Sequence, residues 1–252
     1  MLPFEQLVAE AVAADVDGWG FGWLDGRATE ERPPWGYARL LAERVGAARA
    51  PLDLDTGGGE VLDEAPTIPV GTVATEGWPA NLALARARLR PRGVDVREHR
   101  PGSPLPVADA SRDLVTSRHP LAPDFAEIAR VLEPGGAYFA QHVGPWSAAE
   151  LSERFLGPLP GHPVLRDPAT EILQAQEAGL ELVAVQSVRL RQEYADIGAI
   201  VWILRKCPWW VPGFDPTRAD DATVRALDRQ LRASGPFVAH ASRHLLELRK
   251  SG

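Results

Sequence analysis

The chain has 252 residues, of which 45% are hydrophobic and 24% charged, ordinary values for a globular protein. Its formal net charge of -7 argues against a nucleic-acid partner, because proteins that grip a phosphate backbone concentrate positive charge. The single cysteine, Cys207, cannot form an internal disulfide, and no Cys/His set has structural zinc spacing, so we expect no metal site. We also expect a cytoplasmic protein, since we find neither a secretion signal nor a membrane-length apolar run.

Apolar runs alternate with amphipathic segments along the chain, which favours βαβ units and an α/β fold with a doubly wound, mostly parallel sheet. Helical spacing predicts helices over 3–16 and 36–48, and we interpret residues 1–48 as an N-terminal helical cap or lid. Residues 49–252 then form the core of a single domain. Within it we predict strands at 51–55, 70–75, 94–99, 112–117 and 137–143, with helices at 60–65, 79–89 and 122–132 between them.

The last third of the chain continues the sheet. We predict helices at 169–178, 197–206 and 217–233, and a long strand at 180–194 from its period-two alternation. Residues 237–250 fit a strand or a helix, and we favour a strand because an antiparallel pair with 180–194 would close the sheet.

Although the chain has a net negative charge, four arginines lie close together in its sequence. The members of this cluster, two residues apart, lie around a helix and not on one face, so we interpret them as a solvated helix end, with anion binding as the alternative. They are Arg86, Arg88, Arg90 and Arg92.

A glycine-rich loop between a strand and a helix is the sharpest local feature. Asp53 and Asp55 precede Thr56-Gly57-Gly58-Gly59, in which glycines allow a tight turn and close approach to a ligand. The helix that follows offers free N–H groups to a polar ligand. A plain strand–helix turn is the alternative.

Glu76 ends the second predicted strand. An acid at this place in a doubly wound sheet accepts hydrogen bonds from ribose hydroxyls, and the carboxyl ends of adjacent strands are where such folds bind ligands. A charge favoured by the N-terminus of the following helix is the alternative.

These features, in their order, resemble the class I S-adenosylmethionine-dependent methyltransferases, and among them the small-molecule group related to ubiquinone-type enzymes. Motifs cover about residues 45–145, and no single one is decisive. The matching segments are Asp53 to Gly59, then Glu76, then Leu105-Pro106 with Asp109 and Asp113-Leu114-Val115, then Leu132-Glu133-Pro134-Gly135-Gly136.

The resemblance implies a seven-stranded Rossmann-like sheet that binds S-adenosyl-L-methionine. The glycine loop would lie against the methionine part, Glu76 would hold the ribose, and Ser117 would border the cofactor. Two departures stand out. The family usually has glycine where this chain has Asp55, and the stretch 100–104 lacks the acid that commonly holds the adenine amino group.

The acceptor side is predicted from the ends of the fourth and fifth strands. His119 is our first candidate for a general base, because histidine titrates near neutrality, and His142 is the second. Arg118 would bind an acidic acceptor. Each has a purely structural alternative, as a hydrogen-bonded histidine or an ion-paired arginine.

Eight tryptophans are many for this length, and several lie outside the predicted sheet. Aromatic side chains line sites for apolar or planar ligands, although they also fill cores. We expect Trp35, Trp146 and Trp209 to contact substrate, with segments 17–37 and 207–214 forming a mobile cover.

The leading hypothesis is therefore methyl transfer to a small-molecule acceptor by a monomer or homodimer. An NAD-dependent oxidoreductase shares the glycine loop and the acid, but no tyrosine has a lysine four residues on. A protein of the same fold that binds a nucleotide cofactor without turnover is the third hypothesis, and its main support is Asp55 together with the missing acid in the stretch 100–104.

Overall fold

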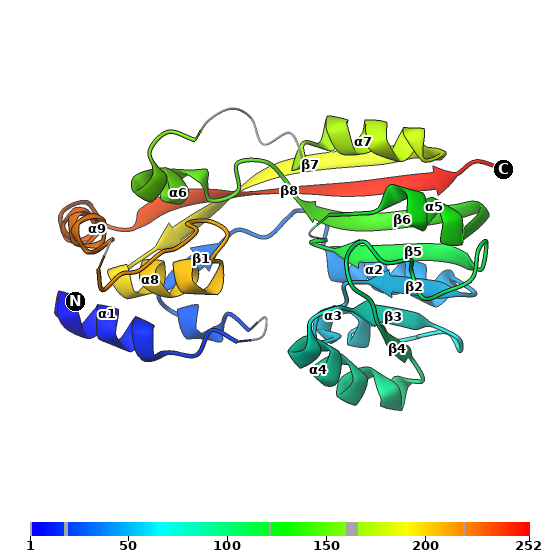
Figure 1. Cartoon of the computed structure of the whole chain (residues 1–252), viewed down its shortest axis with the longest axis horizontal. Coiled ribbons are helices and arrows are strands. Elements are labelled where there is room, and N and C mark those ends of the chain that lie inside the picture. Colours follow the sequence, from blue (N-terminus) through cyan, green and yellow to red (C-terminus); the bar gives the residue numbers. More distant parts are fainter. Residues whose placement is uncertain (1, 18–19, 121, 160–165, 219) are drawn as a thin grey trace. The chain divides into compact units, whose positions relative to one another are not determined.

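The computed structural model describes residues 2–17, 20–120, 122–159, 166–218 and 220–252. Figure 1 labels the helices and strands along the chain. They are α1 (Phe4–Ala13), η1 (Gly22–Leu24), β1 (Ala28–Glu30), α2 (Tyr37–Ala47), β2 (Pro51–Leu54), α3 (Glu60–Asp63), β3 (Val73–Glu76), α4 (Pro79–Leu89), η2 (Arg90–Arg92), β4 (Asp95–Glu98), β5 (Arg112–Arg118), α5 (Phe125–Val131), β6 (Leu132–Val143), α6 (Ala149–Leu156), α7 (Pro168–Glu177), β7 (Leu180–Tyr194), α8 (Ile197–Lys206), α9 (Asp221–Ser234) and β8 (Phe237–Lys250).

The chain divides into two compact units. Unit 1 comprises residues 1–32, 146–162 and 189–242, and unit 2 comprises 33–145, 163–188 and 243–252. The division does not follow the predicted boundary at residue 48, since α2 belongs to the same unit as the glycine loop. The assignment of one domain to the whole chain stays a prediction.

Unit 2 contains the predicted doubly wound sheet. β4, β3, β2, β5 and β6 are parallel in that spatial order, and β8 is antiparallel to β6. Next in the order come β7 and then β1, which pairs antiparallel with β7 in unit 1. Over the described residues the sheet thus has eight strands, and the predicted count of seven is not confirmed. β1 was missed because three residues carry no periodic signal.

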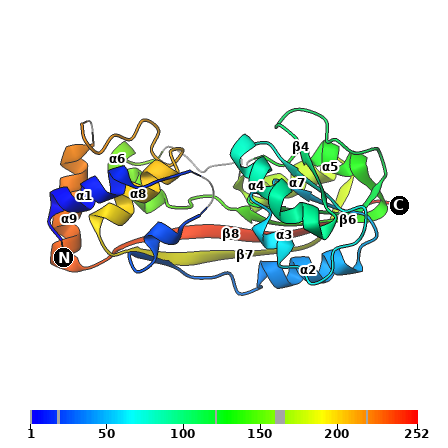
Figure 2. The same ribbon diagram turned by 90° about the horizontal axis from the view of Figure 1, so that it is seen from below.

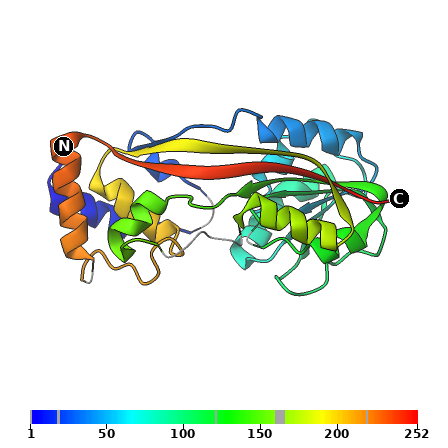
Figure 3. The ribbon, with the colours of Figure 1, turned by 90° about the horizontal axis from the view of Figure 1, so that it is seen from above.

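Helices cover both faces of the unit 2 sheet, as Figures 2 and 3 show with α2 on one side and α5 and α7 on the other. Alternate strand residues enter the two cores: Tyr138 packs with α5 and α7, and its neighbour Phe139 packs with α2, α3 and α4. This alternation is the period-two geometry of a strand buried on both faces. Because β4, β3, β2, β5 and β6 run parallel, their carboxyl ends lie at the same edge of the sheet.

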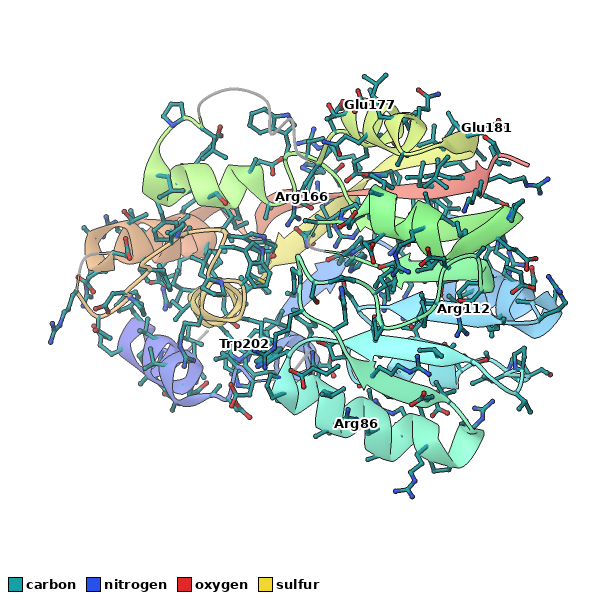
Figure 4. The ribbon with its side chains drawn as sticks, turned by 45° about the vertical axis from the view of Figure 1, so that its right-hand side comes forward. Arg86, Arg112, Arg166, Glu177, Glu181 and Trp202 are labelled. Atoms are coloured by element: carbon teal, nitrogen blue, oxygen red, sulfur yellow. The ribbon has the colours of Figure 1, made fainter. Side chains whose placement is uncertain are left out.

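Unit 1 packs α1, α8 and α9 around an apolar core of its own. The α8 helix, predicted at 197–206, is buried on almost every side, and the Asp196 side chain caps its N-terminus by accepting from the Ala199 N–H at 2.9 Å. Trp202 of α8, labelled in Figure 4, stacks on Trp23 with ring centroids 5.7 Å apart.

The sequence predictions are confirmed for most elements, with boundaries that shift by a few residues. Residues 237–250 form a strand, as favoured, and β8 lies next to β7 in the sheet. The helix α6 was not predicted, and α9 begins four residues later than expected. No described helix has the length and apolar character needed to cross a membrane.

Candidate functional site

The glycine loop lies where β2 ends and α3 begins. Its backbone enters the left-handed region three times, with φ of 52° at Asp55, 65° at Gly57 and 81° at Gly59. A Cβ on Gly59 would also come within 2.8 Å of the Leu89 side chain, so glycine is required there. Asp55 adopts a conformation that costs a non-glycine residue about 1 kcal/mol, which is a physical reason for glycine at this position in the resembling family.

Glu76 ties the end of β3 to this loop. Its Oε2 accepts a hydrogen bond from the Gly57 N–H at 2.9 Å, and its Oε1 accepts one from the Trp78 N–H at 2.7 Å. Burial raises the pKa of the carboxyl group above its ordinary value, against the lowering effect of these backbone hydrogen bonds. The predicted ribose-binding acid therefore also holds the loop in shape.

Three carboxyl groups gather at this edge of the sheet: Asp53, Asp55 and Glu76. Asp53 is 8% exposed and accepts a hydrogen bond from the Thr116 hydroxyl at 2.6 Å. Burial, with a smaller contribution from the neighbouring Asp55 carboxylate, raises the pKa of Asp53 to about 6 against the lowering effect of the hydrogen bond from Thr116. Burial also raises the pKa of Asp55, whose charge in turn raises the pKa of Glu76. Such a set of acids is stabilised by a bound cationic group.

The predicted arginine cluster makes contacts within unit 2. The Arg88 guanidinium donates to the Gly58 carbonyl and, at 2.6 Å, to Glu60 Oε1. Arg86, labelled in Figure 4, donates to the Val96 carbonyl, and Arg92 donates to the carbonyl groups of Asp63 and Ala65. These contacts correct our interpretation of a simply solvated helix end, because Arg88 donates hydrogen bonds to the glycine loop and to the helix that follows it.

Buried polar atoms without partners lie near the same edge. Asn81, in the first turn of α4, is 1% exposed, and neither its Oδ1 nor its Nδ2 has a hydrogen-bond partner. The Ser117 hydroxyl near the end of β5 is also buried and has no hydrogen-bond partner. Unmet hydrogen bonds of this kind are costly and mark places where a ligand atom can be recognised. The sequence analysis predicted Ser117 but missed Asn81, whose only signal was its place after Glu76.

His119 follows β5 with a φ of 60°. Its backbone N–H donates to the Gln141 carbonyl at 2.7 Å, and its Nε2 lies 2.8 Å from Gln141 Nε2. Burial lowers the pKa of His119 well below its ordinary value, and the charges of Arg243 and Arg118 lower it further. The ring is therefore neutral at pH 7.

The tautomer of His119 follows from Trp35. The indole N–H of Trp35 can only donate, and it lies 2.7 Å from Gln141 Oε1, so the Gln141 amide turns its NH2 group toward His119. The His119 Nε2 then accepts, and its proton resides on Nδ1. In this arrangement the ring offers a donor, and it acts as the predicted base only if the Gln141 bond breaks.

Trp35 itself is 7% exposed and belongs to the apolar core on the α2 face of the sheet. This burial argues against the predicted place of Trp35 in a mobile cover. The indole instead positions Gln141. Neither Gln141 nor this role was predicted, because the contact joins residues 106 positions apart.

His142 is 1% exposed, and both ring nitrogens are engaged: Nδ1 with Glu171 at 2.7 Å and Nε2 with the Tyr138 hydroxyl at 2.9 Å. This environment argues against His142 as the second base, since no nitrogen is free to take a proton from an acceptor. Arg118 ends β5 with its side chain exposed. Trp146 and Trp209 belong to unit 1, and their contact with substrate stays a prediction, as does the cover (residues 18–19 lie outside the described part).

Part of the chain that carries this geometry matches a known protein family. Residues 52–140, from β2 almost to the end of β6, match the family model described as a methyltransferase domain. A search of curated proteins by sequence found no match.

Solved structures resemble the whole chain at low identity. A candidate methyltransferase from Bacillus halodurans C-125 is 18% identical, with 86% of this chain and 100% of that chain covered and a TM-score of 0.57. Geranyl diphosphate methyltransferase in complex with SAM is 15% identical over 85% and 78% of the two chains, with a TM-score of 0.52. The [4+2]-cyclase SpnF is 18% identical over 97% and 93%, with a TM-score of 0.54. At these identities the likeness shows the fold alone, and the cyclase shows that this fold does not fix one reaction.

Proposed function

We propose that this chain is a class I methyltransferase that transfers the methyl group of S-adenosylmethionine to a small-molecule acceptor, which its match to a methyltransferase domain and its fold support. The observation that carries the proposal is the joint arrangement of Glu76 with the glycine loop at the ends of β3 and β2. Acid and loop are bonded to each other at the edge where doubly wound sheets bind nucleotide-like ligands.

The residues present suit a ligand that carries both a ribose and positive charge. S-adenosylmethionine supplies a methyl group on a cationic sulfonium, and its amino-acid part bears an ammonium group. Asp53 and Asp55 would face these positive charges, Thr56 to Gly59 would offer backbone groups, and Glu76 would accept from the ribose. Ser117 and Asn81 have free buried donors and acceptors for the remaining polar atoms.

On the acceptor side, His119 would donate a hydrogen bond from Nδ1, and Arg118 would attract an acidic group. Methyl transfer depends mainly on in-line positioning and exclusion of water, so a residue that orients the nucleophile is sufficient when the acceptor is already ionised. We therefore assign His119 a positioning role toward an acceptor oxygen or nitrogen.

The test is calorimetric titration with S-adenosylmethionine, S-adenosylhomocysteine and NAD. We expect the first two to bind and NAD not to bind. Equal binding of NAD, or binding of NAD alone, would refute the proposal. Release of S-adenosylhomocysteine across a panel of phenolic, amine and carboxylate acceptors then tests turnover and narrows the acceptor class.

Binding without methyl transfer is the second candidate, because Asp55 departs from the family pattern and a fold neighbour is described as a cyclase. In that case S-adenosylmethionine binds but no acceptor releases S-adenosylhomocysteine. Turnover with any acceptor, abolished in Glu76→Ala, would exclude this candidate.

A further inference from the structure

Three buried side chains of unit 2 converge on one point. His142 of β6 and His244 of β8 stand directly opposite each other in the antiparallel pair, and Glu171 comes from the first turn of α7. Glu171 Oε2 lies 2.7 Å from His142 Nδ1 and 2.6 Å from His244 Nε2. One potential ligand atom from each residue falls within a set whose members lie within 4.8 Å of one another.

All three side chains of this cluster are buried. His142, Glu171 and His244 are 2%, 4% and 1% exposed. The Glu171 carboxyl group therefore lies in the interior, and among the described residues the basic groups within ion-pair distance of it are His142 and His244. A buried charge is costly unless it is paired or coordinates a metal.

We propose that His142, Glu171 and His244 bind one divalent transition-metal ion of the zinc class. Two imidazole nitrogens and one carboxylate oxygen form a ligand set that holds zinc in proteins, with a fourth position for water or another ligand. The proposal does not rest on methyl transfer. It also explains why spacing along the sequence predicted no site, since the ligands are 29 and 73 residues from Glu171.

The geometry needs only a small adjustment to hold the ion. Tetrahedral zinc with bonds of about 2.0–2.1 Å keeps its ligand atoms roughly 3.4 Å apart. The two imidazole nitrogens now lie 2.7 and 2.6 Å from Glu171 Oε2, so each contact opens by less than about 1 Å.

Tyr138 completes the surroundings of the site. Its hydroxyl lies 2.9 Å from His142 Nε2, on the same face of β6. When His142 coordinates through Nδ1, its ring proton resides on Nε2. The Nε2–H group can then donate a hydrogen bond to the Tyr138 hydroxyl oxygen. An outer partner of this kind fixes the ring orientation of a metal-bound histidine.

The experiment uses the tag-free full chain, stripped with a chelator and titrated with Zn²⁺ in competition with a chromophoric chelator. We expect one Zn²⁺ per chain, and Co²⁺ in its place should give the visible absorption of a four-coordinate N/O site. Tyr138→Phe should weaken binding by about 10–100-fold, the range for outer-shell partners, and His142→Gln, Glu171→Gln or His244→Gln should weaken it more.

The matched control is His240→Gln. His240 bonds to a glutamate, Glu150, with Nδ1 2.7 Å from Oε1, but that pair has no second histidine, so this variant should bind Zn²⁺ as the wild type does. Wild-type chain that retains no stoichiometric Zn²⁺ and gives no Co²⁺ absorption would overturn the proposal. So would equal binding by folded variants that lack a ligand. If the ligand variants do not fold, the wild-type stoichiometry and the Co²⁺ spectrum decide by themselves.

Discussion

The substitution Asp53→Asn separates two effects of the buried Asp53 carboxylate: its cost to the stability of the folded chain and its contribution to ligand binding. Asp53 is 8% exposed, and Asn preserves the oxygen that accepts from the Thr116 hydroxyl. We expect the variant to gain stability relative to wild type as pH rises, and to lose affinity for S-adenosylmethionine, because the carboxylate that would face the ligand's positive charge is gone.

The magnitude follows from the pKa of Asp53, which rises from 3.8 to about 6 on folding. A carboxyl group with a raised pKa binds more protons in the folded chain, so wild-type stability falls as pH increases between these two values. At about 1.4 kcal/mol per pKa unit, the loss is about 1.6 kcal/mol at pH 5 and about 3 kcal/mol at pH 8. The new amide N–H2 adds a cost that does not depend on pH, about 1–3 kcal/mol if it stays unpaired.

The pH-dependent part is therefore the test. The free energy of unfolding of Asp53→Asn minus that of wild type should increase by about 1.4 kcal/mol from pH 5 to pH 8, measured by urea unfolding followed by tryptophan fluorescence. The control is Asp25→Asn, which removes an exposed carboxylate and should show no such increase. A difference that stays constant or decreases with pH would refute the assignment of a costly buried charge to Asp53.

Other substitutions test the remaining contacts. Glu76→Ala should weaken binding of S-adenosylmethionine by about 1.5–3 kcal/mol, because hydrogen bonds to a charged group are lost, and an unchanged dissociation constant in calorimetry would contradict the ribose assignment. Asp55→Gly should raise the melting temperature by relieving the φ of 52°, while weakening S-adenosylmethionine binding if Asp55 meets the ammonium group; tighter binding would show that Asp55 crowds the ligand. Trp35→Ala should lower the free energy of unfolding by about 3–5 kcal/mol, and Trp209→Ala, at a site 47% exposed, by no more than about 0.5 kcal/mol. The reverse order in urea unfolding would restore Trp35 to a mobile cover. Nitrogen NMR of the His119 ring should find a neutral, Nδ1-protonated imidazole at pH 6, and a charged ring at that pH would contradict the tautomer inferred from Gln141.

The sequence alone determined the parallel core of unit 2 and the sheet edge at which Asp53, the glycine loop and Glu76 meet. Local signals suffice for these features: apolar runs of strand length, glycines that the turn after β2 requires, and an acid at the end of β3. Asp53, the glycine loop and Glu76 lie within 24 residues, and βαβ connection rules bring the ends of adjacent parallel strands to the same edge.

Only the tertiary structure decided which buried polar groups meet. Trp35 reaches Gln141 across 106 positions, and His142, Glu171 and His244 come together from two strands and a helix. No periodicity records such contacts, because they depend on the register of β6 against β8 and on the packing of helices over the sheet. For the same reason the sequence could not distinguish His119 from His142 as candidate bases. In the structure the His119 ring is neutral and has Nδ1–H as a donor. Both nitrogens of the His142 ring are engaged in hydrogen bonds.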